Sequence, residues 1–140
     1  MSRVAIVERL RAAGCVFAED EAQLLIEAAS TPQALAAMVD KRVAGLPLEH
    51  VVGWADFCGQ RIAIDPGVFV PRRRTELLVQ RAAALTPPGA TVVDLACGSG
   101  AIGVAIAALV DGVTLHAVDI EPAAVRCAQR NLTPLGGRVY

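Results

Sequence analysis

The feature that most constrains this chain of 140 residues is a run of small residues between two apolar segments. Gly98, Gly100 and Gly103 satisfy the pattern G-x-G-x-x-G, after a strand expected at 91–95 and before a helix expected at 101–109. Glycine allows positive φ and lets a ligand approach without a Cβ in the way. The helix that follows presents unpaired N–H groups at its N-terminus. The loop's place between strand and helix therefore predicts a ligand-binding site rather than an ordinary turn.

The segments around this loop predict an α/β fold. Strands are expected at 91–95 and 113–118, helices at 101–109 and 121–132, and a third strand starts at 138–140. Strands and helices that alternate in this way form a parallel, right-handed sheet of the Rossmann type.

Residues 1–46 predict an N-terminal bundle of three helices. Ser2 is expected to cap the first helix, and Thr31, which is followed by proline, is expected to cap the third. Apolar residues recur at helical spacing, with Val4 and Val7 on the inner face of the first helix. This pattern predicts a separate helical domain with a core of its own.

Residues 47–70 are expected to form a β-hairpin linker, with strands at 51–57 and 61–65. Residues 71–140 then form the first part of the sheet domain. Thr75 is expected to cap a helix at the start of this domain. The residues expected along one side of that helix are Leu77, Leu78, Arg81, Ala82 and Leu85.

Charge and apolar content exclude several classes of protein. Thirteen basic and 14 acidic residues give a net charge of −1, so no strong field attracts nucleic acid or an anionic membrane. The longest uninterrupted apolar run, residues 101–110, is about half of the roughly 20 residues that span a bilayer. A hydrophobic content of 54% excludes a disordered chain.

The four cysteines predict free thiols in a reducing, cytoplasmic setting. They form no C-x-x-C pair, and only two histidines accompany them, so closely spaced zinc ligands are absent. The N-terminal segment carries charges throughout and has no signal-peptide core. Such a chain is expected to keep its cysteines reduced.

Two carboxylates flank the glycine loop. Asp119 ends the second strand, where it can accept hydrogen bonds from both ribose hydroxyls of an adenosine ligand. A helix cap is the structural alternative for this residue. Asp94 ends the first strand, where a negative charge suits cationic S-adenosylmethionine better than the pyrophosphate of NAD. NAD fits the other features as well, so a nucleotide-binding oxidoreductase stays open at this point.

Four segments resemble the HemK/PrmC family of methyltransferases. They are residues 70–79 (VPRRRTELLV), 94–103 (DLACGSGAIG), 117–119 (AVD) and 128–131 (AQRN). Members of this family transfer a methyl group from S-adenosylmethionine to a glutamine side-chain amide, usually in peptide chain release factors. The resemblance implies a Rossmann-like class I methyltransferase sheet, and a release-factor-binding role for residues 1–46.

The resemblance also implies which residues hold the cofactor. The methionine end would be lined by Asp94, Ala96, Gly98 and Gly100. Asp119 would hold the ribose, and residues 69–75 would form one wall. The cysteine spacing and the balanced charge lead us to expect no metal and no direct nucleic-acid contact. The implied cofactor-binding residues are Pro71, Arg72, Thr75, Asp94, Ala96, Cys97, Gly98, Gly100, Asp119 and Ile120.

Two departures from the family pattern bear on activity. Arg73 stands where the family has a second proline, which indicates another substrate, a different local backbone or a solvated charge run. The catalytic motif Asn-Pro-Pro-Tyr is missing, because the only asparagine, Asn131, precedes Leu132. The chain is therefore expected to be a truncated front portion of an enzyme, inactive alone, with an exposed sheet edge that favours self-association. A methylase of ribosomal protein or DNA, and a non-catalytic partner-binding fragment, remain alternatives.

Overall fold

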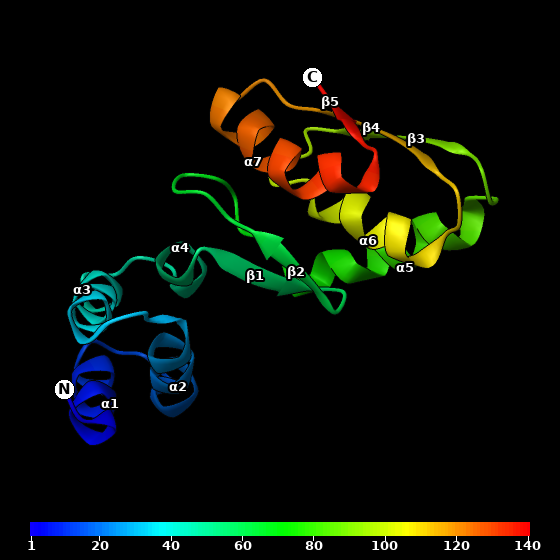
Figure 1. The fold of residues 1–140 in the computed structure, drawn as a ribbon. Helices are drawn as coiled ribbons and strands as arrows, with labels where there is room; N and C mark the ends of the chain where they lie inside the picture. Colours follow the sequence, from blue (N-terminus) through cyan, green and yellow to red (C-terminus); the bar gives the residue numbers. More distant parts are fainter. The chain divides into compact units, whose positions relative to one another are not determined.

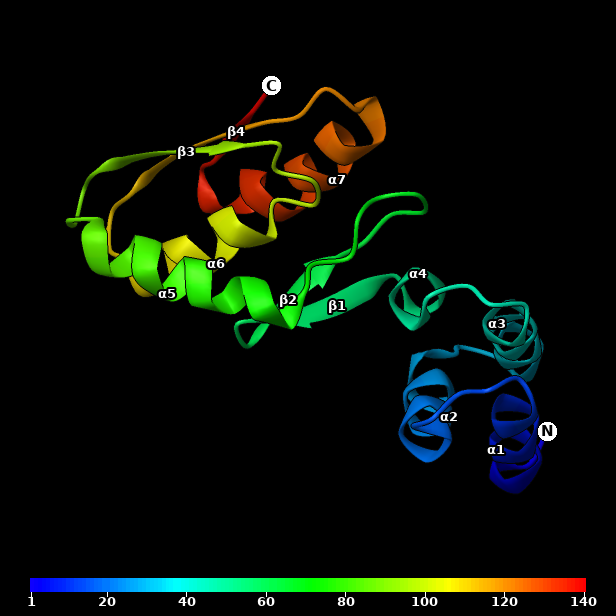
Figure 2. The same cartoon turned by 180° about the vertical axis from the view of Figure 1, so that it is seen from behind.

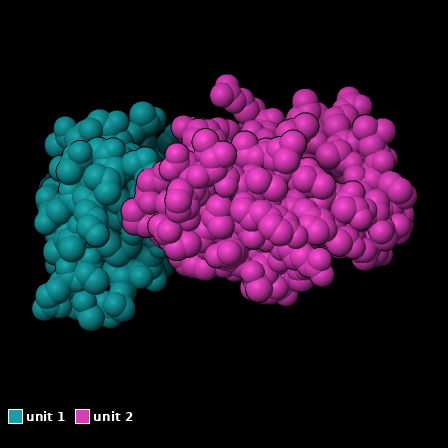
Figure 3. All heavy atoms as spheres, turned by 90° about the horizontal axis from the view of Figure 1, so that it is seen from above, with its two compact units in different colours: residues 1–52 teal, residues 53–140 magenta.

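The computed structural model covers all 140 residues and contains two compact units, residues 1–52 and 53–140 (Figure 3). The first unit is helical and the second combines a hairpin, a parallel sheet and helices (Figure 1). The predicted mixed α/β fold class is confirmed. A separate linker at 47–70 stays a prediction. None of the helices is long and apolar enough to cross a membrane.

The first unit contains four helices: α1 (Arg3–Ala12), α2 (Ala18–Ala28), α3 (Pro32–Val43) and α4 (Leu48–Val52). Two helices start where the sequence places their caps. The Ser2 hydroxyl accepts from the Ala5 N–H at 3.3 Å, and the Thr31 hydroxyl accepts from the Ala34 N–H at 3.0 Å. Each cap satisfies an N–H group that the helix itself leaves unpaired.

The core of this helical unit has one difference from the sequence prediction. Val7 is buried as expected, but Val4 is 68% exposed, and Ile6 takes its place in the core. Residues 6, 7 and 10 lie together on the face of α1 that packs on the other helices. A half-buried ion pair joins α2 to α3, where the Arg42 Nε donates to Glu21 at 2.6 Å.

The second unit contains β1 (Trp54–Phe57), β2 (Gln60–Ala63), a 3-10 turn η1 (Arg73–Thr75), α5 (Glu76–Leu85), β3 (Thr91–Leu95), α6 (Ala101–Leu109), β4 (Thr114–Val118), α7 (Pro122–Leu132), a 3-10 turn η2 (Thr133–Leu135) and β5 (Arg138–Val139). Strands β1 and β2 form an antiparallel hairpin. Strands β3, β4 and β5 form a parallel sheet in that order. The predicted parallel arrangement is therefore confirmed.

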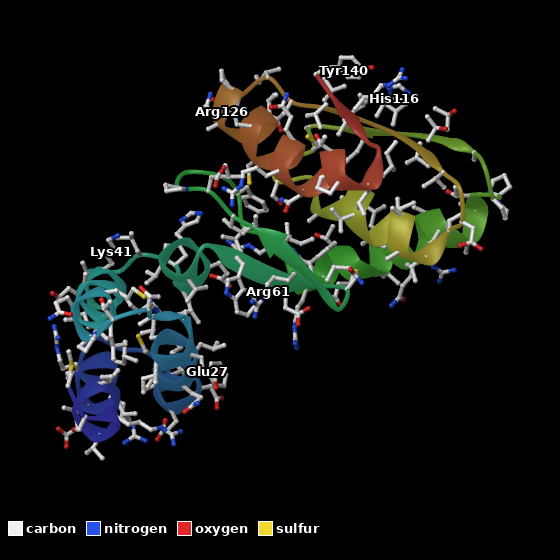
Figure 4. All side chains as sticks on the ribbon, viewed as in Figure 1. Glu27, Lys41, Arg61, His116, Arg126 and Tyr140 are labelled. Atoms are coloured by element: carbon white, nitrogen blue, oxygen red, sulfur yellow. The ribbon has the colours of Figure 1, made fainter.

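Helices α5, α6 and α7 all lie on one side of the parallel sheet (Figures 1 and 2). Their apolar faces and the hairpin share one core with β3 and β4. The opposite face of the sheet exposes Val93 at 56% and Leu95 at 73%. On the same face the rings of His116 and Tyr140 stack, with centroids 5.8 Å apart (Figure 4).

Two local predictions upstream of the sheet are wrong. Residues 51 and 52 end helix α4 instead of starting a strand, so the hairpin is shorter than expected. Thr75 lies inside the turn η1 with helical φ and ψ, and its side chain makes no capping hydrogen bond. The Glu76 carboxylate instead accepts from the Cys58 N–H at 3.2 Å, which ties the start of α5 to the hairpin turn.

The predicted apolar side of α5 is not its buried side. Leu77, Leu78 and Leu85 are between 56% and 85% exposed, whereas Val79 is fully buried. Of the predicted side, Ala82 does pack against the core, together with Ala83. Periodicity alone could not choose between these two faces, because both carry apolar residues.

Substitution of Gly100 by alanine is expected to lower the free energy of unfolding by about 2–4 kcal/mol. Gly100 has a φ of +79°, and a Cβ there would lie 2.9 Å from Leu132 Cδ1, within a fully buried side chain. Gly136→Ala is the matched control, because its φ is +78° with no atom within 4 Å of the new Cβ. It is expected to cost about 1 kcal/mol, from backbone strain alone.

Urea unfolding of the two variants and the unsubstituted chain measures both effects. Equal losses for the two glycines would contradict a steric role for the contact between Gly100 and Leu132.

Candidate functional site

The loop between β3 and α6 holds a shape that small residues permit. Ala96, Gly98 and Gly100 all have positive φ, of +58°, +55° and +79°. The Cys97 N–H donates to the Val118 carbonyl at 3.0 Å, and the Gly100 N–H donates to the Cys97 carbonyl at 2.8 Å. Positive φ at an alanine is strained and persists only where the surroundings impose it. The loop is therefore a defined structure rather than a mobile connection.

Asp119 joins this loop to the end of β4. One carboxylate oxygen accepts from the Gly98 N–H at 2.8 Å, and the other accepts from the Glu121 N–H at 3.0 Å. Because Glu121 immediately precedes α7, the second contact resembles the capping alternative that the sequence left open. Each carboxylate oxygen has a second lone pair, so the same group can also accept from ligand hydroxyls.

Asp94 lies half-buried at the end of β3. The backbone N–H of Gly103, in the first turn of α6, lies near enough to its carboxylate to favour the charged form. Its Oδ2 is buried and has no hydrogen-bond partner. Burial raises the pKa of Asp94, and the nearby charge of Asp119 raises it further, while the Gly103 N–H opposes both. A buried acceptor without a donor is rare in folded proteins and points to a missing cationic or hydrogen-bonding group.

A cavity of about 280 Å³ opens beside the loop. That volume is close to the lower end of the range for small-molecule sites. Its walls come from the hairpin, the segment before α5, the glycine loop, the first turn of α6 and the end of β4. The lining residues are Phe57, Phe69, Pro71, Arg72, Thr75, Ala96, Cys97, Gly98, Ser99, Ala101, Ile102 and Asp119.

Most of the residues that the sequence predicted for the cofactor line this cavity. The exceptions are Asp94, Gly100 and Ile120. The Asp94 carboxylate has a buried oxygen, Gly100 packs against Leu132 of α7, and the Ile120 side chain is 92% exposed. The binding role of each predicted residue stays a prediction. The residues that the structure brings to the cavity are Pro71, Arg72, Thr75, Ala96, Cys97, Gly98 and Asp119.

Sequence analysis did not assign Phe57, Ser99, Ala101 or Ile102 to the site. The last three lie within or directly after the glycine loop, so their positions in the motif were an available signal. Phe57 comes from β1, and no local pattern relates it to the loop. It is 1% exposed and contributes an aromatic wall.

Two further side chains set the character of the cavity. The Arg72 guanidinium lies 5.3 Å from the centre of the exposed Phe69 ring, within the range of a cation–π contact. Burial and the charge of Asp94 raise the pKa of the Cys97 thiol to about 11. Cys97 is therefore a neutral thiol near pH 7 and lacks the thiolate that a nucleophile needs.

No group of three or more His, Cys, Asp or Glu side chains could hold a metal ion.

The family profile described as "Methyltransferase small domain" matches residues 59–138. The chain belongs to this family. The match includes the glycine loop, both carboxylates, strands β3 and β4 and the first residue of β5.

Curated relatives confirm the resemblance seen in the sequence. The release factor glutamine methyltransferase of Geobacter sulfurreducens is 37% identical, over 77% of this chain and 39% of the relative. That of Mycolicibacterium smegmatis is 38% identical, over 80% of this chain and 41% of the relative. A 4-amino-L-phenylalanine/4-methylamino-L-phenylalanine methyltransferase of Streptomyces pristinaespiralis is 37% identical, over 72% of this chain and 37% of the relative. The chain spans about two fifths of the length of these relatives.

Asp94→Asn is expected to raise the free energy of unfolding at pH 7 by about 1 kcal/mol, because it removes a buried charge with an unpartnered oxygen. A carboxyl whose pKa is raised by folding binds its proton more tightly in the folded state. Its contribution to stability is therefore greatest at low pH and is lost as pH rises through the raised pKa. The advantage of the variant should shrink as pH falls through that pKa.

Urea unfolding between pH 4 and pH 8 measures this difference. Asp111→Asn makes the same chemical change at an exposed position in the turn before β4 and should show no such trend. A variant that is less stable than the unsubstituted chain at pH 7 would contradict the prediction that the buried charge of Asp94 destabilises the folded state.

Proposed function

We propose that residues 53–140 bind S-adenosylmethionine, and that the whole protein is an N-methyltransferase. The observation that carries the proposal is the cavity beside the glycine loop, with Asp119 in its wall and the buried, unpartnered Asp94 oxygen at the end of the neighbouring strand β3. S-adenosylmethionine, when bound, supplies an electrophilic methyl group on a positively charged sulfur. Two carboxylates within one small region suit a ligand that carries an ammonium and a sulfonium group.

The residues present fit each part of this cofactor. The turns of the loop at Gly98 and Gly100 let the ligand approach the backbone closely, and Asp119 retains lone pairs for ribose hydroxyls. Phe57 and Phe69 offer apolar surface, as an adenine ring or a thioether requires. The protein's part in methyl transfer is then to orient the cofactor and exclude water from one side of it.

A glutamine side-chain amide of a release factor is the methyl acceptor that the comparisons favour. Relatives with release factor glutamine methyltransferase names cover most of this chain, from both of its units. We infer that the helical unit, residues 1–52, contacts this protein substrate. In these 140 residues the only asparagine, Asn131, is bonded to Ala63 and Ser99 within the fold. It is therefore not available to hold a substrate amide at the cavity.

A small aromatic amine is the second candidate acceptor. The relative from Streptomyces pristinaespiralis carries the name of a methyltransferase for 4-amino-L-phenylalanine, and its identity to this chain equals that of the Geobacter relative. Both acceptors present nitrogen to the cofactor, so the cofactor site by itself does not separate them.

Calorimetric titration with S-adenosylhomocysteine tests the cofactor proposal. The unsubstituted chain should bind saturably, and Asp119→Ala should weaken binding by about 10- to 100-fold, because it removes a charged acceptor for two hydroxyls. Asp111→Ala is the matched control, since it removes an exposed carboxylate at the other end of β4, and should change binding by less than twofold. A chain that is folded by circular dichroism and binds NADH but not S-adenosylhomocysteine would overturn the proposal.

Tritiated S-adenosylmethionine tests whether these 140 residues, whose only asparagine is bonded within the fold, transfer a methyl group to either candidate acceptor. The 140-residue chain is expected to bind the cofactor without methylating either a release factor or 4-amino-L-phenylalanine. Release factor methylation by this chain, at a rate like that of a full-length relative, would contradict this expectation.

A further inference from the structure

The Asn131 side chain connects two backbone positions that are far apart in sequence, Ala63 and Ser99. Its Oδ1 accepts from the Ala63 N–H at 2.9 Å, and its Nδ2 donates to the Ala63 carbonyl at 2.9 Å and to the Ser99 carbonyl at 2.8 Å. The surroundings fix the orientation of the amide, because it faces one N–H donor and two carbonyl acceptors. Asn131 thus joins β2, α7 and the glycine loop at one point.

The contact with Ala63 completes the edge of the hairpin. The Ile64 N–H donates to the Gly53 carbonyl across the hairpin, so the N–H and C=O of the preceding Ala63 point away from β1. A carboxamide offers the same donor and acceptor pair as a peptide group. Asn131 therefore makes the two hydrogen bonds to Ala63 that a neighbouring strand would otherwise make. The Cys127 thiol, one turn earlier on α7, also donates to the Ala63 carbonyl at 3.2 Å.

The contact with Ser99 holds the middle of the glycine loop. Ser99 is 3% exposed and lies between Gly98, which is bonded to Asp119, and Gly100, which packs against Leu132. The loop is therefore fastened at consecutive residues by the end of β4 and by the end of α7. Apolar packing also joins the loop to the hairpin that supplies the Phe57 wall of the cavity, but among hydrogen bonds only those of Asn131 connect the two.

We propose that Asn131 is a positioning residue for the cofactor site: it sets the glycine loop and the hairpin at the spacing that S-adenosylmethionine requires. The ligand named here rests on the proposed function, whereas the effect of Asn131 on the loop does not. An amide is needed for this role, because aspartate of the same shape would place a carboxylate against the carbonyls of Ala63 and Ser99.

The first experiment measures amide hydrogen exchange without ligand. In Asn131→Asp, the peptides that cover residues 96–103 should exchange at least tenfold faster at pH 7.5, while those in β4 stay within twofold of the unsubstituted chain. Gln129→Glu is the matched control, because it makes the same change from amide to carboxylate at an exposed position of α7. Unchanged exchange of the loop in Asn131→Asp would overturn the proposal.

The second experiment is titration with S-adenosylhomocysteine. At pH 7.5, Asn131→Asp should bind at least tenfold more weakly than Gln129→Glu, and the ratio should approach one as pH falls to 5. The reason is that a protonated carboxyl donates to one carbonyl again, and burial beside two carbonyls raises its pKa. Both variants share the other titratable groups around this point, which are Cys127, the Asp65–Arg130 pair, Asp119, Cys97 and Asp94.

Cys127→Ala separates positioning from stability. This variant removes a contact between α7 and Ala63 but leaves the Ser99 bond intact. It is expected to lower the unfolding temperature while weakening ligand binding less than threefold. Equal weakening by Cys127→Ala and Asn131→Asp at equal loss of stability would overturn the proposal in favour of a purely structural role.

The outcomes for the two proposals are distinct. If the unsubstituted chain does not bind S-adenosylhomocysteine but the loop of Asn131→Asp exchanges faster, the ligand assignment fails and the role of Asn131 stands. If the unsubstituted chain binds and Asn131→Asp binds equally well at pH 7.5, the role of Asn131 fails and the ligand assignment stands.

Discussion

The packing of Leu132 against three glycines is the constraint on which the second unit depends. Leu132 is fully buried, and a Cβ at Gly100, Gly103 or Gly137 would lie within 3.1 Å of its atoms. Leu132, at the end of α7, therefore packs directly on the backbone of the loop, of α6 and of the turn before β5. Larger residues at these positions would push α7 away, because packed interiors leave no space to absorb the added volume.

That close approach brings polar groups into reach of the loop. Asn131 lies next to Leu132 and bonds to Ser99, while Asp119 bonds to Gly98 from the end of β4. The loop is thus fixed by hydrogen bonds from two elements before any ligand arrives. Such preorganisation lowers the entropy that binding must otherwise cost. The Asp94 oxygen is the contrasting case, since the fold leaves it buried without a donor.

The sequence predicted the elements that carry strong local signals. Ser2 and Thr31 cap their helices, and the helix and strands next to the glycine loop begin and end within a residue of the prediction. Predictions failed where two faces of a helix carry apolar residues, as in α5, or where a short helix replaced a strand at Val51 and Val52. In those places local preference is weak and tertiary contacts decide.

The sequence by itself determined the glycine loop, the two carboxylates beside it and the family to which they belong. These features lie in one continuous segment, so the spacing of residues along the chain is enough to relate them. Only the tertiary structure decided that Phe57 closes the cavity and that Asn131 fastens the loop to Ala63. Those contacts join residues more than 30 positions apart, and no local pattern encodes which side chains will meet once the helices and the hairpin pack together.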